Sequence, residues 1–157
     1  MRRRRILTAL TLITLCLIWG HSALGQDSSA AESGWLFEHI GGLLRLIFGP
    51  EKATEHLLRK LAHFGEFFLL GAEMYLLAAE CGRTGIAAAF GVLLRCNFCA
   101  FLDETIQIFS GRGPDIKDVW LDTFGAAAGI LLVLAVRWTG ELRAGNGPQE
   151  GQEGAGS

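Results

Sequence analysis

The sequence predicts an all-α, polytopic membrane protein with about four transmembrane helices and one further helix lying on the outer membrane surface. Half of the 157 residues are hydrophobic. They occur in separate blocks of about twenty residues, the length of a helix that crosses a bilayer. The formal net charge is only −2, and the sequence has no basic stripe with interleaved aromatic residues. A nucleic-acid partner is therefore not expected.

The first hydrophobic segment, residues 6–24, directly follows the basic cluster of residues 2–5. Residues 23–25, Ala-Leu-Gly, resemble a signal-peptide cleavage site. The bulky Trp19 and a length close to that of a membrane span instead favour a retained helix. We assign residues 1–25 to an N-terminal transmembrane anchor with signal-like features. In either case the arginines stay in the cytoplasm and the following segment lies outside.

Residues 26–60 form the predicted outer region. Its first part, residues 26–34, is polar and is expected to be a loop. From Trp35 to Phe48, apolar residues recur at helical spacing, namely Leu36, Ile40, Leu43 and Ile47. About fourteen residues are too few to cross a bilayer as a helix. This pattern therefore predicts an interfacial helix, ended by Gly49-Pro50.

Residues 61–138 are predicted to be a core of three further spans, over residues 61–80, 86–109 and 119–136. This arrangement gives a multi-pass protein of the cell membrane with both termini in the cytoplasm, as the N-terminal arginine cluster favours. The tail, residues 139–157, is rich in glycine and glutamate with nothing to bury, and is expected to be disordered.

Polar residues interrupt the hydrophobic blocks at positions that this topology brings to one membrane face. The second span starts outside, the third ends outside, and the fourth starts outside. Members within one span lie three or four residues apart and therefore share a helix face. We expect a ligand-binding polar pocket beneath the outer surface, formed by Lys60, His63, Glu66, Asp103, Glu104, Gln107, Arg112, Asp118 and Asp122.

Several members also have simpler interpretations. Asp115 and Asp118 stand where acidic residues cap a helix start. Lys60 could extend its ammonium group to the interface, His63 could be a hydrogen-bonded packing residue, and Glu104 could point into solvent. The prediction therefore depends on the set rather than on any one residue.

Two charged residues deeper in the spans, Glu73 and Arg95, are predicted to form a structural ion pair, because counting residues from the helix ends puts them at similar depth. Gly125-x-x-x-Gly129 is predicted to allow close approach of a neighbouring helix. Cys96-x-x-Cys99 lacks a second pair of ligands and is interpreted as packing. We assign no metal ligands and no cofactor, although a divalent cation held by the carboxylates would be compatible with the pocket.

At these residues the chain resembles the VanZ-like family, named for a protein associated with teicoplanin resistance. The resemblance is carried by K-x-x-H-x-x-E, D-E-x-x-Q, G-R and D-x-x-x-D, in this order, within residues 59–71 and 100–129, and more loosely by residues 18–34. It implies that the polar set listed above is the family's set. It also implies that the first span is kept. Phe67 stands where the family often has Tyr, and Asp122 where many members have Asn.

Three functions remain open at this stage. The first is a non-enzymatic protein that binds or shields a membrane lipid or lipid-linked cell-envelope precursor, with glycopeptide resistance as one consequence. The second is an intramembrane enzyme acting on a lipid-linked phosphate or ester head group, with His63 or a carboxylate as general base. The third is a structural assembly partner. The chain has no H-E-x-x-H motif, no P-loop and no nucleophile signature beside the polar set, so we lean away from an enzyme.

Overall fold

The structure, a computed structural model, describes residues 1–23, 26–111 and 115–145, with only the backbone of residues 26–33 and 141–145. These parts of the chain form five helices and no strand. In chain order they are α1 (Arg2–Ala23), α2 (Gln26–Phe48), α3 (Glu55–Glu80), α4 (Gly85–Phe109) and α5 (Ile116–Gly145). The predicted all-α fold is confirmed.

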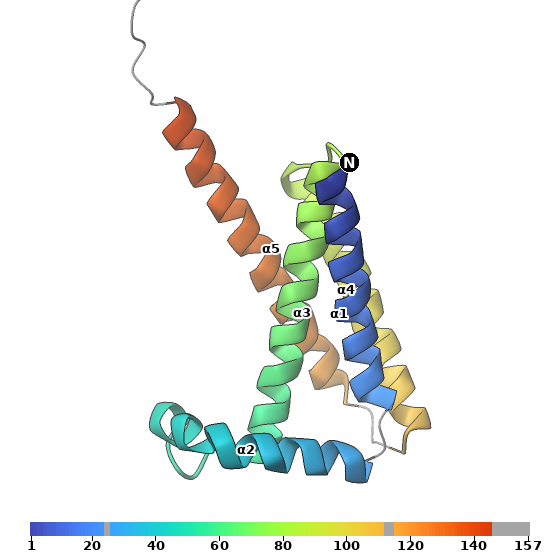
Figure 1. The fold of residues 1–157 in the computed structure, drawn as a ribbon, viewed down its shortest axis with the longest axis vertical. Coiled ribbons are helices and arrows are strands. Elements are labelled where there is room, and N and C mark those ends of the chain that lie inside the picture. The colour runs from blue at the N-terminus through green and yellow to red at the C-terminus, as the bar shows by residue number, and fades with distance from the viewer. Residues whose placement is uncertain (24–25, 112–114, 146–157) are drawn as a thin grey trace, which may run out of the picture.

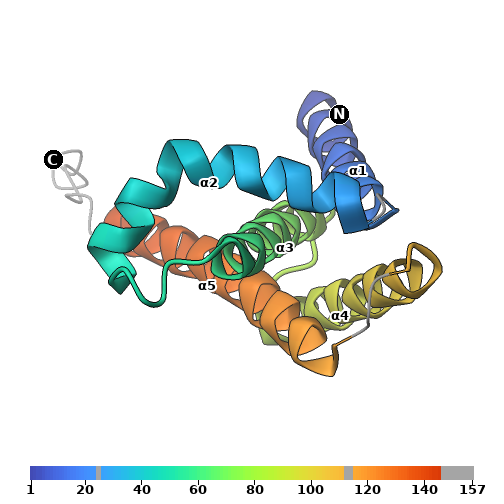
Figure 2. The ribbon, with the colours of Figure 1, turned by 90° about the horizontal axis from the view of Figure 1, so that it is seen from below.

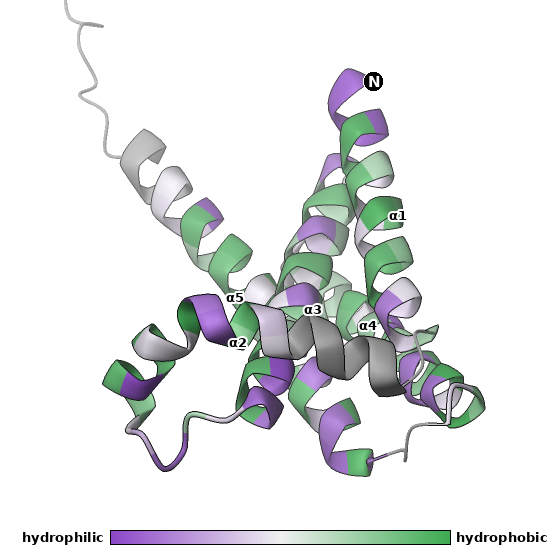
Figure 3. Ribbon diagram, turned by 60° about the horizontal axis from the view of Figure 1, so that its bottom comes forward, coloured by the Kyte–Doolittle hydropathy of each residue, from purple (hydrophilic) through white to green (hydrophobic). Residues whose placement is uncertain are grey.

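Four of the five helices, α1, α3, α4 and α5, are long and apolar enough to cross a membrane. Figure 1 shows them running up and down beside one another, with α2 lying across one end of the bundle. We call this end, where α1 and α4 finish and α3 and α5 begin, the α2 end. Figure 3 shows that hydrophobic residues cover most of the long helices, while many of the hydrophilic residues gather near the helix ends. The protein is thus a multi-pass membrane protein.

The second helix is longer than the sequence predicts. The expected interfacial helix over Trp35–Phe48 is present, but α2 already begins at Gln26, so the loop predicted for residues 26–34 is wrong. The alanines and the glutamate of residues 26–34 are good helix formers. A polar stretch of this kind is compatible with a helix as well as with a loop. Figure 2 shows α2 running beside the start of α3. Gly49 ends the helix with a φ of 86°, a conformation that favours glycine.

The third helix begins at Glu55, inside the predicted outer region and before the predicted start of the span at residue 61. Thr54 caps it, since its side-chain oxygen accepts a hydrogen bond from the Leu57 backbone N–H at 3.1 Å. At the other end of the bundle, the hydroxyl of buried Tyr75 accepts a hydrogen bond from the Gly85 N–H at 3.2 Å. These contacts satisfy backbone groups at the starts of α3 and α4.

The closest helix pair is α3 and α5, which pack on each other more extensively than any other pair. A Cβ atom on Gly125 or Gly129 would collide with the backbone carbonyl oxygen of Phe64 or Phe68, respectively. A Cβ on Gly71 would collide with the Ala126 carbonyl oxygen. The predicted close approach at the two α5 glycines is confirmed. Gly71 is its counterpart on α3, which the sequence analysis did not identify.

The N-terminal helix is an integral part of the bundle. Ile18 is completely buried in the main hydrophobic core, together with Phe67, Leu70 and Cys96. Thr11 and Thr14 also face inward. Because α1 packs against both α3 and α4, its removal would uncover part of the core. This packing supports a retained helix rather than a cleaved signal.

Two further sequence predictions concern the C-terminal tail and the cysteines. Helix α5 continues to Gly145, so the tail predicted to be disordered from residue 139 is helical at its start. Residues 146–157 lie outside the described residues. All four cysteines are free, and Cys96 is buried, consistent with the packing interpretation of the C-x-x-C pair.

Candidate functional site: a buried polar cluster at one end of the helix bundle

Polar side chains from α3, α4 and α5 meet at the α2 end of the bundle. On α4, Asp103, Glu104 and Gln107 are 0%, 6% and 5% exposed, although α4 is one of the four helices apolar enough to cross a membrane. Asp122 on α5 is 1% exposed. Burying polar and ionisable groups in a membrane-spanning bundle is costly unless they are paired or serve a function. These residues, with Lys60, His63, Glu66 and Asp118, form what we call the polar cluster.

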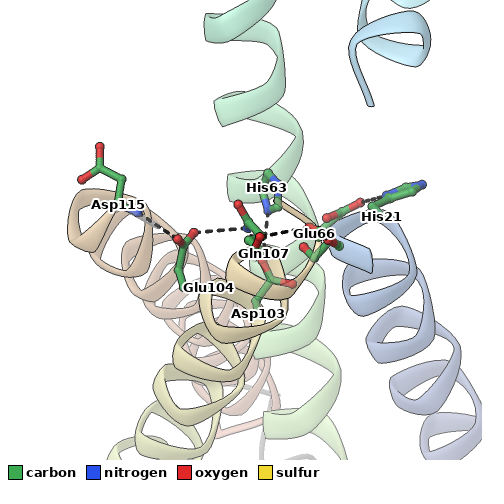
Figure 4. A network of polar contacts seen from close by, with 9 residues as sticks. His21, His63, Glu66, Asp103, Glu104, Gln107 and Asp115 are labelled. Carbon is green, nitrogen blue, oxygen red and sulfur yellow. Dashed lines mark hydrogen bonds and ion pairs between the residues drawn. The ribbon is translucent and has the colours of Figure 1, made fainter. Parts of the chain in front are cut away.

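The amide of Gln107 holds the α4 part of the cluster together. Its Nε2 donates to Asp103 Oδ2 at 2.9 Å and to Glu104 Oε1 at 3.2 Å (Figure 4). The three residues lie within one turn of α4, as their spacing of three and four predicts. One amide group thus orients two carboxylates, a role for which glutamine, with two N–H donors, is suited.

The second oxygen of Glu104 connects α4 to the start of α5. Glu104 Oε2 accepts a hydrogen bond from the Asp115 backbone N–H at 3.0 Å (Figure 4). The Asp115 carboxylate in turn accepts from the Lys117 N–H at 2.9 Å, and α5 begins one residue after Asp115. The capping interpretation of Asp115 is therefore confirmed. Glu104 points into the protein and does not simply face solvent.

Lys60 and Asp118 form the shortest ion pair of the cluster. Lys60 Nζ donates to Asp118 Oδ1 at 2.6 Å, joining the second turn of α3 to the first turn of α5. Both side chains are about one-third exposed, at 27% and 30%. Lys60 is thus engaged with a cluster carboxylate rather than reaching only for the membrane interface. This pair forms the solvent-accessible edge of the cluster.

His63, Asp103 and Asp122 meet at the centre, one from each of three helices. His63 Nδ1 lies 3.9 Å from Asp103 Oδ2, and one potential ligand atom from each residue lies within 4.8 Å of the others. Both carboxylate oxygens of Asp122 and Oδ1 of Asp103 are buried and have no hydrogen-bond partner among the described residues. The close α3–α5 approach at Gly125 and Phe64 explains this meeting, since these residues neighbour Asp122 and His63 along their helices.

Two residues of α1 complete the site and were not among those predicted. His21 Nδ1 lies 2.9 Å from Glu66 Oε1 (Figure 4), and the Ser22 carbonyl oxygen accepts from Ser110 Oγ at 2.9 Å. His21 stands in the last turn of the first span, at the same membrane face as the predicted set. Arg112 belongs to the predicted set but lies outside the described residues.

The predicted Glu73–Arg95 ion pair is wrong. Among the described residues, neither side chain takes part in a salt bridge, and Glu73 instead accepts a hydrogen bond from Thr14 Oγ1 of α1 at 3.0 Å. Arg95 lines a cavity with Arg83 toward the opposite end of the bundle. Counting residues gives the depth of a side chain but not the direction in which its helix face points.

Replacing Thr14 by valine should lower the stability of the protein, because the partly buried Glu73 carboxylate would lose its hydrogen-bond donor. A buried acceptor left without its donor typically costs about 1–3 kcal/mol. Thermal unfolding in detergent measures the change. Thr8→Val is the matched control, since Thr8 is exposed and its hydroxyl bonds only to the Arg4 carbonyl of its own helix. Equal melting temperatures for the two variants would contradict the role of Thr14.

Beside the polar cluster, a groove of about 450 Å³ lies between α4 and α5. Most of its wall is apolar, and Glu104 and Asp115 lie at its polar part, with the remaining lining formed by Phe101, Thr105, Ile108, Ile116 and Val119. Phe101, Ile108 and Ile116 are all exposed. An apolar wall that meets carboxylates at one edge matches the two-part chemistry of a lipid, with its hydrocarbon chain and polar head group.

The fold and this site define a class: a polytopic, all-α membrane protein whose buried polar cluster lies at one end of its bundle, beneath a helix that runs across that end. The match to a known family is more specific. The chain belongs to the VanZ/LLP1 family, which matches residues 6–137. The predicted resemblance is therefore confirmed, and the match includes α1, α2 and every residue of the polar cluster. A comparison with curated proteins and one with solved structures each found no match.

Proposed function

We propose that this VanZ-family protein binds or shields a cell-envelope lipid or lipid-linked wall precursor at the outer face of the cell membrane. In this proposal the α2 end faces outward and both termini are cytoplasmic, as the basic cluster of residues 2–5 favours. The observation that carries it is the meeting of polar side chains from three helices, with those of α4 and Asp122 buried, beside an apolar groove. Such a pairing suits a ligand with one apolar and one polar part.

The amphipathic helix α2 fits this role. It lies at the α2 end of the bundle, beside the start of α3 (Figure 2), and several of its large apolar residues are exposed, among them Trp35, Leu43, Leu46 and Ile47. A helix of this kind lies in the interface with its apolar residues in the lipid. It would hold the site at the level of lipid head groups. A protein that occupies or covers a wall precursor there would limit access of a glycopeptide such as teicoplanin.

An enzymatic function is the second candidate, supported by the position of His63. His63 Nδ1 lies 3.9 Å from a buried carboxylate, and a small closure of this distance would allow the acid to orient the imidazole as a general base. The substrate would be a lipid-linked phosphate or ester. Incubation of the purified protein with lipid-linked precursors, followed by mass spectrometry of the products, separates this candidate from binding alone. Turnover that His63→Ala abolishes would favour the enzyme.

The binding proposal predicts that His63→Ala and Gln107→Ala each raise susceptibility to envelope-directed glycopeptides, in a host that the wild-type protein protects, without lowering the protein level. The same variants should lose most of the envelope lipid that co-purifies with the wild type, measured by mass spectrometry of the gently purified protein. His56→Ala is the matched control, because His56 is exposed near the start of the same helix. Unchanged susceptibility and unchanged lipid in both cluster variants at normal protein levels would overturn the proposal.

A further inference from the structure

We propose that His63, Asp103 and Asp122 bind a divalent transition-metal cation of the Zn²⁺ or Mn²⁺ kind. One potential ligand atom from each residue lies within 4.8 Å of the other two. Ligands of such an ion stand about 2.0–2.2 Å from it, so two of them are at most roughly 4.4 Å apart. The His63–Asp103 distance of 3.9 Å is already in this range. Three ligands around one ion are at most about 3.8 Å apart, so atoms within 4.8 Å of one another would have to contract by up to about 1 Å.

The independent observation that points to a ligand is the unsatisfied state of the two carboxylates. Asp103 is 0% and Asp122 1% exposed, yet Asp103 Oδ1 and both oxygens of Asp122 lack any hydrogen-bond donor in the part of the chain that the structure describes. Buried carboxylates are ordinarily paired with a cation or bound to a metal. The ammonium group of Lys60 is 2.6 Å from Asp118 instead. A cation between Asp103 and Asp122 would supply the missing partner.

The donor set indicates which cation fits. One imidazole nitrogen with two carboxylates suits zinc, manganese or iron, whereas calcium and magnesium prefer oxygen ligands alone. Two carboxylates also cancel the charge of a divalent ion, and a neutral group is the least costly one to hold within a membrane-spanning bundle. Gln107 donates to Asp103 Oδ2, the oxygen 3.9 Å from His63 Nδ1, and would orient the carboxylate as an outer-shell partner.

Three protein ligands leave at least one coordination position open. The open position would accept a phosphate or carboxylate oxygen of an envelope ligand. This step rests on the proposed binding function, but the metal site itself does not need it. Metal content can be measured without any envelope ligand, so failure of one proposal is distinguishable from failure of the other.

The test uses the full chain, purified in detergent, stripped with a chelator and then loaded separately with Zn²⁺, Mn²⁺ or Mg²⁺. After removal of free metal, elemental mass spectrometry should find about one Zn²⁺ or Mn²⁺ per chain, as one site predicts, and much less Mg²⁺. Asp122→Asn and His63→Gln should each lower this content at least about tenfold, the usual scale for loss of a metal-site residue. His56→Ala, exposed and outside the site, should retain it.

Thermal unfolding gives a second readout that does not depend on metal retention during purification. The same cation should raise the melting temperature of the wild type and of His56→Ala, and leave that of Asp122→Asn unchanged. Asp122→Asn removes a buried charge, so the variant should fold and its insensitivity can be measured. Wild-type protein without bound metal and without a thermal shift overturns the proposal. Equal metal content in Asp122→Asn and wild type also overturns it, as it would show adventitious binding.

Discussion

Gly129→Ala should destabilise the helix bundle more than any other single methyl-sized change at a glycine of α5. The added Cβ would collide with the Phe68 carbonyl oxygen and lie 3.0 Å from the Ala72 backbone nitrogen. Both neighbours are backbone atoms of α3, which cannot rotate away as a flexible side chain can. The two helices must therefore separate. Overpacking of this kind costs about 1–3 kcal/mol, and more where the backbone has to shift.

The matched control is Gly140→Ala on the same helix. No atom lies within 4 Å of a Cβ at that position, and alanine favours a helix over glycine by about 1 kcal/mol, so the control should be neutral or slightly stabilising. Gly71→Ala and Gly65→Ala form the same comparison on α3. An added Cβ would collide with the Ala126 backbone at Gly71, whereas at Gly65 no atom lies within 4 Å of it. Thermal unfolding in detergent measures all four. Equal melting temperatures for Gly129→Ala and Gly140→Ala would contradict the close packing.

The Gly129 substitution should also affect the polar cluster. The same α3–α5 approach brings Asp122 toward His63, so helix separation would pull apart groups from α3 and α5. If the proposed metal site exists, Gly129→Ala should lower its affinity while leaving its ligands intact. A variant that unfolds readily but retains full metal content would show that the site tolerates movement of the helices.

The second large effect is expected at the Lys60–Asp118 pair. Lys60→Met and Asp118→Asn should each destabilise the protein, and the double variant should be less destabilised than the sum of the two. A hydrogen bond between charged groups contributes about 1.5–3 kcal/mol, and the 2.6 Å contact between side chains that are mostly shielded is of this kind. Removing Lys60 leaves the Asp118 carboxylate beside other carboxylates, and removing the Asp118 charge weakens the hydrogen bond of the Lys60 ammonium group.

A double-mutant cycle measures this coupling, and the chain supplies its own comparison pair. Arg3 and Glu80 lie 3.5 Å apart at the opposite end of the bundle, with side chains 85% and 34% exposed. Exposed pairs of this type contribute little because water and salt screen them. The cycle at Lys60 and Asp118 should therefore give a clearly larger coupling than the one at Arg3 and Glu80. Equal couplings would show that the Lys60 pair is only a surface contact.

The predictions that were correct concern position along the membrane normal. Blocks of about twenty apolar residues identified the four spans, because a bilayer of fixed thickness imposes that length on any helix that crosses it. The same topology brought His63, Asp103 and Asp122 to one level. Local spacing also identified the contacts of Gln107 with Asp103 and Glu104, since residues three and four apart share a helix face.

The predictions that were wrong concern the direction in which a helix face points. Glu73 and Arg95 were paired by depth alone, but Glu73 bonds to Thr14. His21 was omitted although it lies at the correct level, and it contacts Glu66. In both cases the contact joins a residue of α1 to a glutamate of α3. Rotation of one helix about its axis relative to another leaves no trace in the spacing of residues within either helix.

The sequence by itself therefore determined the class of protein, the spans, the polar face and the family, because these follow from hydrophobic length, charge placement and local motifs. Only the tertiary structure decided which polar groups meet. It packed α1 into the core, brought α3 against α5 through Gly71, Gly125 and Gly129, and left the Asp122 carboxylate buried without a donor among the described residues. The physical reason is that helix rotation and approach depend on complementary packing between distant segments, which no single segment contains.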